Sequence, residues 1–368
     1  MDLSTLYKTQ ISLTEWFQRM GLANSEAHRK EDNAKRERLA VLNEYFGLPF
    51  DRPTQFPASE LANSSPRFEE FLKTRGEELC ALRLIPIDPV MPKLRTRGAS
   101  IAESMKWFAL QEIDPEKYKA DFVPHPDDNT WSTIFVINQH GAFGDVLAGP
   151  HNELTQGFSS DGMEPMTFAW DGEHWSLSLN RPLAEAHLRE VMAMLRVNDP
   201  AVRERLTKEF GATFFGEFLC GYFETATSTE FGIWFIDWNR LLGKAYADTT
   251  TLPLTKGESE GVLRGQIGSR GSATGRARVI LAADVADANI ESGEIIVTDM
   301  TTPDFLPLMM KAGGVVTAWG GILSHAAIVC RELGKPCVTN VKGLLESIHD
   351  GDLIGVDAVD GEIKMIFR

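Results

Sequence analysis

The stretch "TAWGGILSHAAIVCRELGKPCV", residues 317–338, places a histidine behind a Gly-Gly pair and at the start of an apolar, helix-forming segment. Gly320 and Gly321 permit a tight turn and a close approach of the backbone. Ser324 is suited to cap a helix whose first residue is His325. We therefore predict a helix that presents a histidine at its N-terminus.

The same stretch indicates where this helix ends and what its histidine can do. Gly334 and Pro336 are typical of a helix stop. A helix N-terminus carries partial positive charge and unpaired N–H groups, which disfavour imidazolium and favour a bound anion. A neutral ring nitrogen of His325 can attack a phosphoryl group, and the helix end and the Ser324 hydroxyl would hold the product. On these residues alone, a phosphate carrier and a histidine that only begins a helix both stay open.

Composition sets the broad class of the protein. The 368 residues are 43% hydrophobic and 24% charged, as in a soluble globular protein of two or three domains. No apolar run reaches the roughly 18 residues of a membrane span, and the N-terminus does not resemble a signal peptide, so we expect a cytoplasmic protein. The net charge of −15 argues against nucleic acid as a partner. We expect no metal site from the cysteines and predict buried thiols: Cys80, Cys220, Cys330 and Cys337.

The pattern along the chain predicts an α/β protein with an α+β N-terminal part. Residues 1–80 are helical in pattern, and their charge run at 29–38 is typical of a solvated helix face. Residues 81–250 mix strands and helices and would form an acceptor-binding domain. A polar linker at 251–262 would lead to a compact α/β domain at 263–368.

Within the middle region, two hairpins and an aromatic strand are predicted. "WSTIFVINQHGAFGDVLAG" at 131–149 and "MTFAWDGEHWSLSL" at 166–179 have the pattern of hairpins. "FGIWFIDWNRLL" at 231–242 has the pattern of a buried strand. The first and the last of these faintly resemble parts of an ATP-grasp domain, so a degenerate ATP-grasp-like domain in residues 1–250 is the alternative to a plain acceptor domain.

The C-terminal region carries a more specific resemblance. "GGILSHAAIVCRELGKPCV" at 320–338 and "VTDMTTPDFLPLMMKAGGVVTAWGG" at 297–321 resemble the swivelling phosphohistidine domain of the PEP-utilising enzymes. That family includes phosphoenolpyruvate synthase, pyruvate phosphate dikinase and rifampicin phosphotransferase. Two departures are mild: Arg270 stands where the family usually has proline, and Cys330 where it usually has alanine. The resemblance covers about 105 residues, a compact domain.

The resemblance implies roles for individual residues. His325 would be the phosphorylated residue, and Ser324, Thr317 and Thr301 would be hydroxyls near its ring. Gly320 and Gly321 would shape the phosphate-binding loop.

The resemblance also implies a reaction. Only about 40 residues follow His325, whereas a pyruvate-binding barrel needs roughly 250, so pyruvate chemistry of the dikinase type has no room. The chain is most similar to the histidine-bearing subunit of phenylphosphate synthase and aryl-ketone kinase type two-component dikinases, enzymes of aromatic compound catabolism. We expect a partner ATP-grasp subunit to bind ATP and Mg²⁺, phosphorylate the histidine and release AMP and phosphate. A small acceptor with a hydroxyl group would then receive the phosphoryl group, and a phenolic compound is our first choice for this acceptor. A self-contained kinase and a non-catalytic regulatory module are the alternatives.

An acceptor site would need cations and aromatic walls. Lys93, Arg95 and Arg97 alternate in "KLRTR" and would share one face of a strand, which suits either phosphate or a solvated edge. Trp131 is a candidate wall, and three histidines are candidates for the general base that deprotonates the acceptor hydroxyl: His125, His140 and His151.

Overall fold

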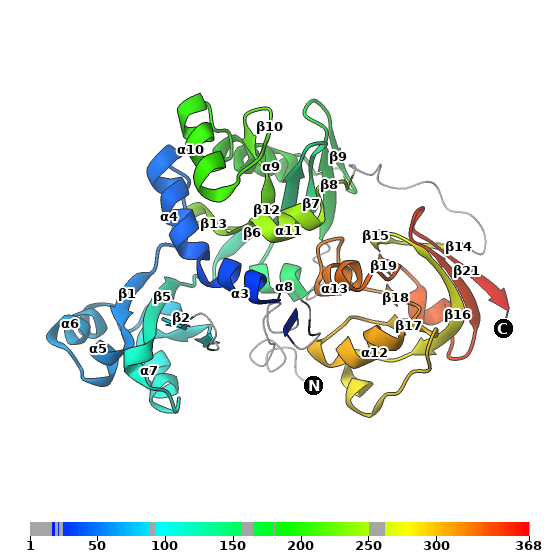
Figure 1. The fold of residues 1–368 in the computed structure, drawn as a ribbon, viewed down its shortest axis with the longest axis horizontal. Helices are drawn as coiled ribbons and strands as arrows, with labels where there is room; N and C mark the ends of the chain where they lie inside the picture. Colours follow the sequence, from blue (N-terminus) through cyan, green and yellow to red (C-terminus); the bar gives the residue numbers. More distant parts are fainter. Residues whose placement is uncertain are drawn as a thin grey trace.

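The computed structural model describes residues 17–18, 21, 25–88, 91, 93–156, 165–179, 181–249 and 262–367. Three sheets, each with its own helices, follow one another along the chain and meet around one region (Figure 1). The mixture of helices and sheets agrees with the predicted α/β class. None of the helices in the described ranges is long and apolar enough to cross a membrane.

The first sheet forms a small unit. Its strands run in the order β1-β5-β2-β3, with β4 beside β2: β1 (Thr54–Pro57), β2 (Leu79–Pro86), β3 (Leu94–Arg95), β4 (Ala99–Ser100) and β5 (Tyr118–Pro124). The turn η1 (Pro115–Lys117) leads into β5, and three helices accompany the sheet: α5 (Ala58–Ala62), α6 (Pro66–Arg75) and α7 (Ile101–Ala109). The rings of Phe56, Phe68, Phe71 and Phe122 fill its core.

The expected division at residue 80 does not coincide with a break in this unit. Thr54 of β1 is paired with Phe122 of β5, so the two sides of residue 80 share one sheet. The cause is the strand β1, which lies in the Pro/Ser-rich stretch that the sequence presents as a turn region. A four-residue strand is too short to show an alternating pattern.

The second sheet is antiparallel and central. Its order is β13-β12-β6-β7-β8-β9: β6 (Asn129–Asn138), β7 (Gly141–Leu147), β8 (Met166–Trp170), β9 (Trp175–Leu177), β12 (Gly221–Ser228) and β13 (Gly232–Asn239). Both predicted hairpins are confirmed, since Asn138 is paired with Gly141 and Trp170 with Trp175. A short hairpin of β10 (Phe214–Phe215) and β11 (Phe218–Leu219) lies outside this sheet.

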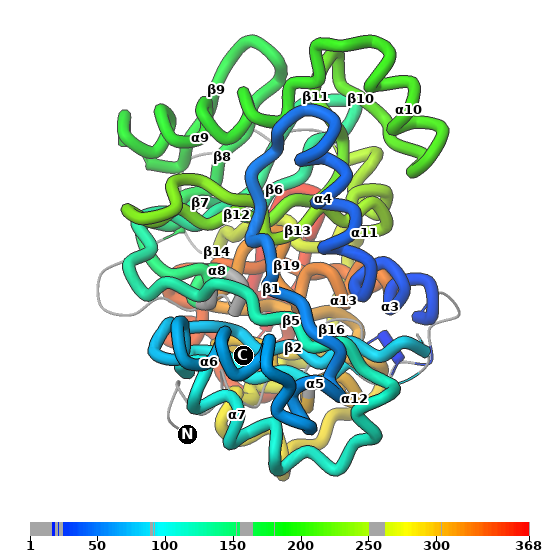
Figure 2. Tube along the Cα trace, turned by 90° about the vertical axis from the view of Figure 1, so that its left-hand side faces the viewer, coloured from blue at the N-terminus to red at the C-terminus, as the bar shows by residue number. Residues whose placement is uncertain are grey.

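The two faces of the central sheet are covered differently. One face packs against α4 (Lys35–Phe46), α9 (Pro182–Met194) and α10 (Pro200–Phe210), through residues such as Leu39, Leu188 and Leu206. The other packs against α11 (Arg240–Ala245) and the C-terminal unit, because one apolar cluster joins Phe143 and Tyr222 of the sheet to Ile328. The helix α8 (His151–Gln156) packs against β6 and β7. In Figures 1 and 2, α13 (His325–Leu333), which carries Ile328, lies near α11 and away from α9 and α10.

The third sheet belongs to the C-terminal unit. Its order is β14-β21-β20-β16-β17-β18-β19-β15, and β16 to β19 run parallel to their neighbours in that series: β14 (Val262–Arg264), β15 (Gln266–Ser269), β16 (Ser272–Val279), β17 (Ile295–Thr298), β18 (Gly314–Thr317), β19 (Cys337–Thr339), β20 (Leu353–Asp357) and β21 (Glu362–Phe367). The helical elements are η2 (Ala282–Asp287), η3 (Pro303–Phe305), α12 (Leu306–Lys311), α13 (His325–Leu333) and α14 (Leu344–Ser347). The compact C-terminal domain predicted at 263–368 begins one residue after Val262, the first residue of this unit. The linker before it lies almost entirely outside the described residues.

The charge run at 29–38 is the main correction at the N-terminus. It spans the end of α3 (Ser25–Asn33) and the start of α4, and its residues Glu31, Arg36 and Arg38 are buried rather than solvated. Arg36 donates to the carbonyl of Ile236 at 2.9 Å, and Arg38 to that of Trp238 at 3.0 Å. The cause is that these helices pack over the end of β13. The first 24 residues of the segment predicted to be helical lie mostly outside the described residues.

Candidate functional site

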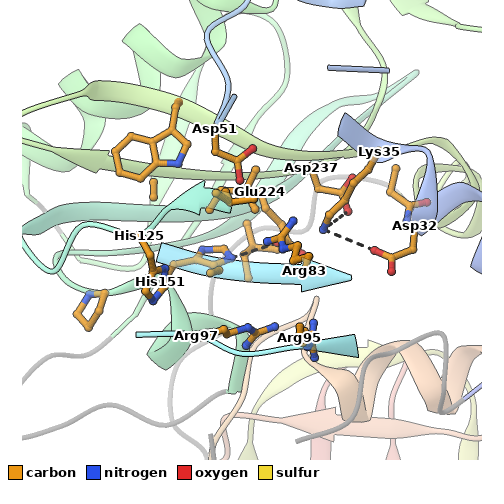
Figure 3. Close-up of a pocket in the computed structure, with 18 of the residues that line it drawn as sticks. Asp32, Lys35, Asp51, Arg83, Arg95, Arg97, His125, His151, Glu224 and Asp237 are labelled. Carbon is orange, nitrogen blue, oxygen red and sulfur yellow. Dashed lines mark hydrogen bonds and ion pairs between the residues drawn. The ribbon is translucent and has the colours of Figure 1, made fainter. Parts of the chain in front are cut away.

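A cavity of about 510 Å³ lies where the small unit, the central sheet and the start of α13 meet. Its walls come from β2, β3 and β5 of the small unit and from β6, β12 and β13 of the central sheet. Figure 3 shows Arg95 of β3 and the nearby Arg97 on one side of the cavity, with Glu224 and Asp237 on the other. His325 and Ile328 of α13 complete the wall. The cavity therefore joins all three sheets around the predicted histidine.

His325 is placed by the local rules that the sequence predicted. Ser324 is the N-cap of α13, and its hydroxyl accepts from the N–H of Ala327 at 3.5 Å. Gly334 ends the helix with φ +64°, as expected from its position. The ring of His325 thus enters the cavity from the first turn of the helix.

The pKa of His325 shows which charges surround the ring. Burial lowers this pKa to about 4, Arg95 and Arg97 act in the same direction, and Glu224 opposes them. The imidazole is therefore neutral at pH 7, as predicted, although burial rather than the helix N-terminus is the main cause. One carboxylate and two guanidinium groups act on the same ring.

The cations of "KLRTR" all line this cavity. Arg95 lies in β3, with Lys93 before it and Arg97 after it, and Arg83 of β2 joins them. Burial lowers the pKa of Lys93 to about 7 and that of Arg83 to about 9. Alternate positions on an extended segment do share one face here. That these cations bind the acceptor stays a prediction.

Two carboxylates form the opposite wall. Glu224 of β12 is paired directly with Asp237 of β13, and the register then shifts, so that Ile236 is an extra residue on β13. This bulge lets both Ile236 and Asp237 line the cavity. Glu224 accepts from the hydroxyl of Tyr222 at 2.9 Å, whereas the buried Oδ1 of Asp237 has no hydrogen-bond partner.

The pKa values of these carboxylates move in opposite directions. Burial would raise the pKa of Glu224, but the hydrogen bond and charge of His151, with further cations, hold it well below its usual range. Burial raises the pKa of Asp237, and the charge of Glu224 adds to that rise. The two groups repel each other, and Lys35 and Arg38 offset part of the charge on Asp237.

Two residues of the charge run belong to the site and were missed. Asp32 and Lys35 line the cavity, and Lys35 Nζ lies 3.7 Å from Asp237 and 3.6 Å from Asp32. Lys93 Nζ lies 3.2 Å from the other carboxylate oxygen of Asp32. Lys35 opens α4 directly after Ala34, the single residue between α3 and α4, and the uncharged pair Asn33-Ala34 in the charge run was the available signal.

Two of the three histidines predicted as candidate bases, His125 and His151, line the cavity. His151 Nε2 lies 3.1 Å from Glu224, and Figure 3 shows His125 beside it. Burial lowers the pKa of His125 to about 4, so its ring is neutral at pH 7. Either ring could take a proton from a hydroxyl group inside the cavity.

Other predicted residues lie elsewhere. Thr317 is buried and donates to the carbonyl of Trp319 at 2.6 Å, and Thr301 is buried outside the cavity wall. Their role near the ring stays a prediction. His140 lies exposed in the β6–β7 turn, and Trp131 stacks on His187 at 5.4 Å. Neither of these two is among the lining residues, so the described cavity does not bring them to His325.

Comparison with known proteins identifies the C-terminal unit. Residues 290–361 match the model of the PEP-utilising enzyme mobile domain. The chain is 42% identical over 107 residues to a rifampicin phosphotransferase of Streptomyces sviceus, which is 29% of this chain and 12% of that protein. It is 42% identical over 106 residues to a phosphoenolpyruvate synthase of Aeropyrum pernix, which is 29% of this chain and 13% of that protein. The mobile domain and its histidine are thus of the type found in phosphotransferases.

The match covers only part of each protein. It spans about an eighth of the length of these curated relatives, so it describes the mobile domain alone. Among solved structures, ATP citrate lyase of Methanothrix soehngenii aligns with 84% of this chain and 94% of its own at 11% identity. The TM-score of that alignment is 0.30, which does not establish a common fold.

Proposed function

We propose that this chain is a phosphotransferase that phosphorylates its own His325 from a nucleotide bound in the cavity and passes the phosphoryl group to a small hydroxyl acceptor. The observation that carries this proposal is the place of His325 in the cavity wall together with Glu224, Arg95 and Arg97, whose charges act on its ring. Phosphoryl transfer depends mainly on positioning and on stabilising charge on the transferred oxygens.

The cations are suited to the phosphate oxygens of the donor. Arg83, Lys93, Arg95 and Arg97 lie on neighbouring segments of one wall. Guanidinium groups bind phosphate through paired hydrogen bonds. The cavity volume of about 510 Å³ lies within the usual range for small-molecule sites.

The carboxylates fit a Mg²⁺ ion. Mg²⁺ in phosphoryl-transfer sites is held by one or two carboxylates and takes its other ligands from phosphates and water. Glu224 and Asp237 supply such a pair, and the buried Oδ1 of Asp237 accepts no hydrogen bond, with Arg38 Nη2 at 3.8 Å as its nearest ion-pair partner. The described residues contain no group of three or more His, Cys, Asp or Glu side chains able to hold a metal by themselves. When bound, Mg²⁺ would neutralise charge on the donor phosphates.

The chain's own residues would carry two transfers. In the first, a ring nitrogen of His325 bonds to the β-phosphorus of ATP, the α,β P–O bond breaks, and AMP leaves with the electron pair; water then cleaves the β,γ anhydride, and phosphate leaves. In the second, the acceptor oxygen bonds to the phosphorus on His325, the N–P bond breaks with its electron pair returning to the ring, and His151 or His125 accepts the hydroxyl proton. In sum, ATP, water and the acceptor alcohol give AMP, phosphate and the phosphate ester.

The acceptor in this proposal is a phenol. Phe17, Tyr222 and Trp234 contribute aromatic surface to the same cavity. Such walls suit a planar ring, with the hydroxyl near the basic residues.

The other arrangement has a partner ATP-grasp subunit that loads His325. The position of the cavity within this chain favours loading without a partner. Phosphorus NMR of the purified chain with Mg-ATP and a panel of phenols distinguishes loading by this chain from loading by a partner subunit. AMP, phosphate and a new ester signal from the chain alone support the proposal. Turnover only after addition of a second nucleotide-binding chain would support the partner arrangement, and phosphorylation of His325 without turnover would support a regulatory module.

A further inference from the structure

One peptide group of the loop that precedes His325 makes hydrogen bonds to the central sheet and to the residue that ends α11. The N–H of Ile322 donates to the carboxylate of Asp145 in β7. The carbonyl of the same residue accepts from the hydroxyl of Tyr246 at 3.2 Å. Both side chains are buried, with Asp145 4% and Tyr246 0% exposed. One peptide of the mobile domain is therefore held on its donor side and its acceptor side.

Asp145 is itself held in place by the neighbouring strand. Thr167 of β8 is directly opposite Asp145, and its hydroxyl donates to Asp145 Oδ1 at 2.8 Å. Gln266 of the mobile domain donates to the same Thr167 hydroxyl. Burial raises the pKa of Asp145 to about 6, and the hydrogen bonds from Thr167 and Ile322 oppose that rise. The carboxylate is thus ionised at pH 7 and oriented toward the loop.

Gly321 shows that this contact leaves no space. A Cβ at this position would overlap Asp145 Oδ2 and would lie 2.7 Å from Asp145 Cγ. Gly320 differs, because its φ of +107° requires glycine for the loop's own conformation. The φ of Gly321 lies outside that left-handed region. Gly321 is therefore required by the contact between the two units rather than by its backbone.

The helix α13, which carries His325, makes a second contact with the same segment near its C-terminal end, through Arg331. The guanidinium of Arg331 lies 4.0 Å from the ring centre of Tyr246, and its Nη1 donates to the Thr249 hydroxyl at 3.4 Å. Ile328 lies between these two contacts and belongs to the same apolar cluster as Leu242 of α11. Contacts along the length of α13 thus orient its first residue toward the cavity.

We propose that Asp145, Thr167 and Tyr246 are positioning residues that form a docking site for the loop at 320–323 and thereby hold His325 in the cavity for phosphorylation. This inference rests on the proposed function. None of the three lines the cavity, so each acts through the loop and not on the phosphoryl group.

The test uses the full chain and the variant Gly321→Ala. Gly355→Ala is the matched control, since Gly355 lies in β20 of the same domain and a Cβ there meets its nearest atom at 3.4 Å. Hydrogen exchange at the Ile322 amide measures docking directly, because that N–H is bonded to a buried carboxylate. Phosphorylation of His325 by Mg-ATP measures the consequence. Phosphorylation by phosphoramidate, a small donor, measures the intrinsic reactivity of the ring.

We expect Gly321→Ala to expose the Ile322 amide and to slow phosphorylation by ATP about 100-fold, the upper range for an overpacked contact. Reaction with phosphoramidate and the control variant should stay within about 2-fold of the parent chain, as for sites that do not touch the contact. The double variant Gly321→Ala with Asp145→Ala should recover part of the lost rate, because removing the carboxylate makes room for the methyl group.

An Ile322 amide that is as protected in Gly321→Ala as in the parent overturns the docking site, and so does an unchanged rate with ATP. The exchange measurement stands apart from activity. If ATP phosphorylates no form of the chain, the proposed function fails, and Ile322 protection that is lost only in Gly321→Ala still supports the docking contact.

Discussion

The protonation of His325 gives a quantitative prediction, because the pKa of about 4 differs widely from that of a solvated histidine. At pH 5.5 a ring with a pKa of about 4 is about 97% neutral, whereas one with the ordinary value of about 6.5 is about 9% neutral. The difference is roughly 10-fold in the concentration of the nucleophilic form. As the pH is raised from 4 to 6.5, the neutral fraction of the His325 ring therefore increases little above about pH 5.

Burial is the largest cause of this shift, and the variant Arg95→Gln tests the part that comes from neighbouring charge. Removing a positive charge near the ring stabilises imidazolium, so the pKa of His325 should rise toward 6.5. Glu224→Gln should act in the opposite sense, because Glu224 stabilises imidazolium in the parent chain. The two variants remove opposite charges from the same cavity and serve as controls for each other.

The measurement is an NMR titration of the histidine ring Cε1–H signals, with the His325 signal assigned by its loss in His325→Gln. The account predicts a midpoint near pH 4 in the parent chain and a higher midpoint in Arg95→Gln. A parent midpoint at about 6.5 would show a solvated ring and would refute the burial of His325 among these charges.

Three further results are expected. Glu224→Gln should lower phosphorylation of His325 by Mg-ATP about 100-fold and raise the Mg²⁺ concentration needed, because it removes half of the carboxylate pair; an unchanged Mg²⁺ dependence would contradict the site. His140→Ala should leave the rate and the acceptor KM unchanged, since this exposed turn residue does not line the cavity, and a KM change in steady-state kinetics would argue against that. Leu188→Ala should cost about 2–5 kcal/mol in urea unfolding, because Leu188 is 0% exposed in the core, whereas Leu110→Ala, at 80% exposed, should cost within about 0.5 kcal/mol.

The site of the histidine could be predicted from the sequence because local rules determine it. Ser324 as a cap and Gly334 as a stop need only neighbouring residues, and both are confirmed. The alternation of Lys93, Arg95 and Arg97 is equally local, and it correctly indicated a shared face. These features need no knowledge of distant contacts.

The opposite wall of the cavity could not be predicted in the same way. The pairing of Glu224 with Asp237 depends on strand register and on a bulge, which no pattern within one strand reveals. Lys35 lies in a charge run of the kind that usually faces solvent. One signal was present: an acidic residue within an apolar strand is costly unless it is paired, and both Asp237 and Asp145 are such residues.

The most direct test of the central claim is the intact mass of the purified chain after incubation with Mg-ATP, beside His325→Asn. The account predicts an acid-labile gain of one phosphoryl group, about 80 Da, in the parent chain without any second protein, and no gain in the variant. A parent chain that stays unmodified until a second nucleotide-binding protein is added would contradict loading in its own cavity, and an equal gain in His325→Asn would contradict the assignment of His325.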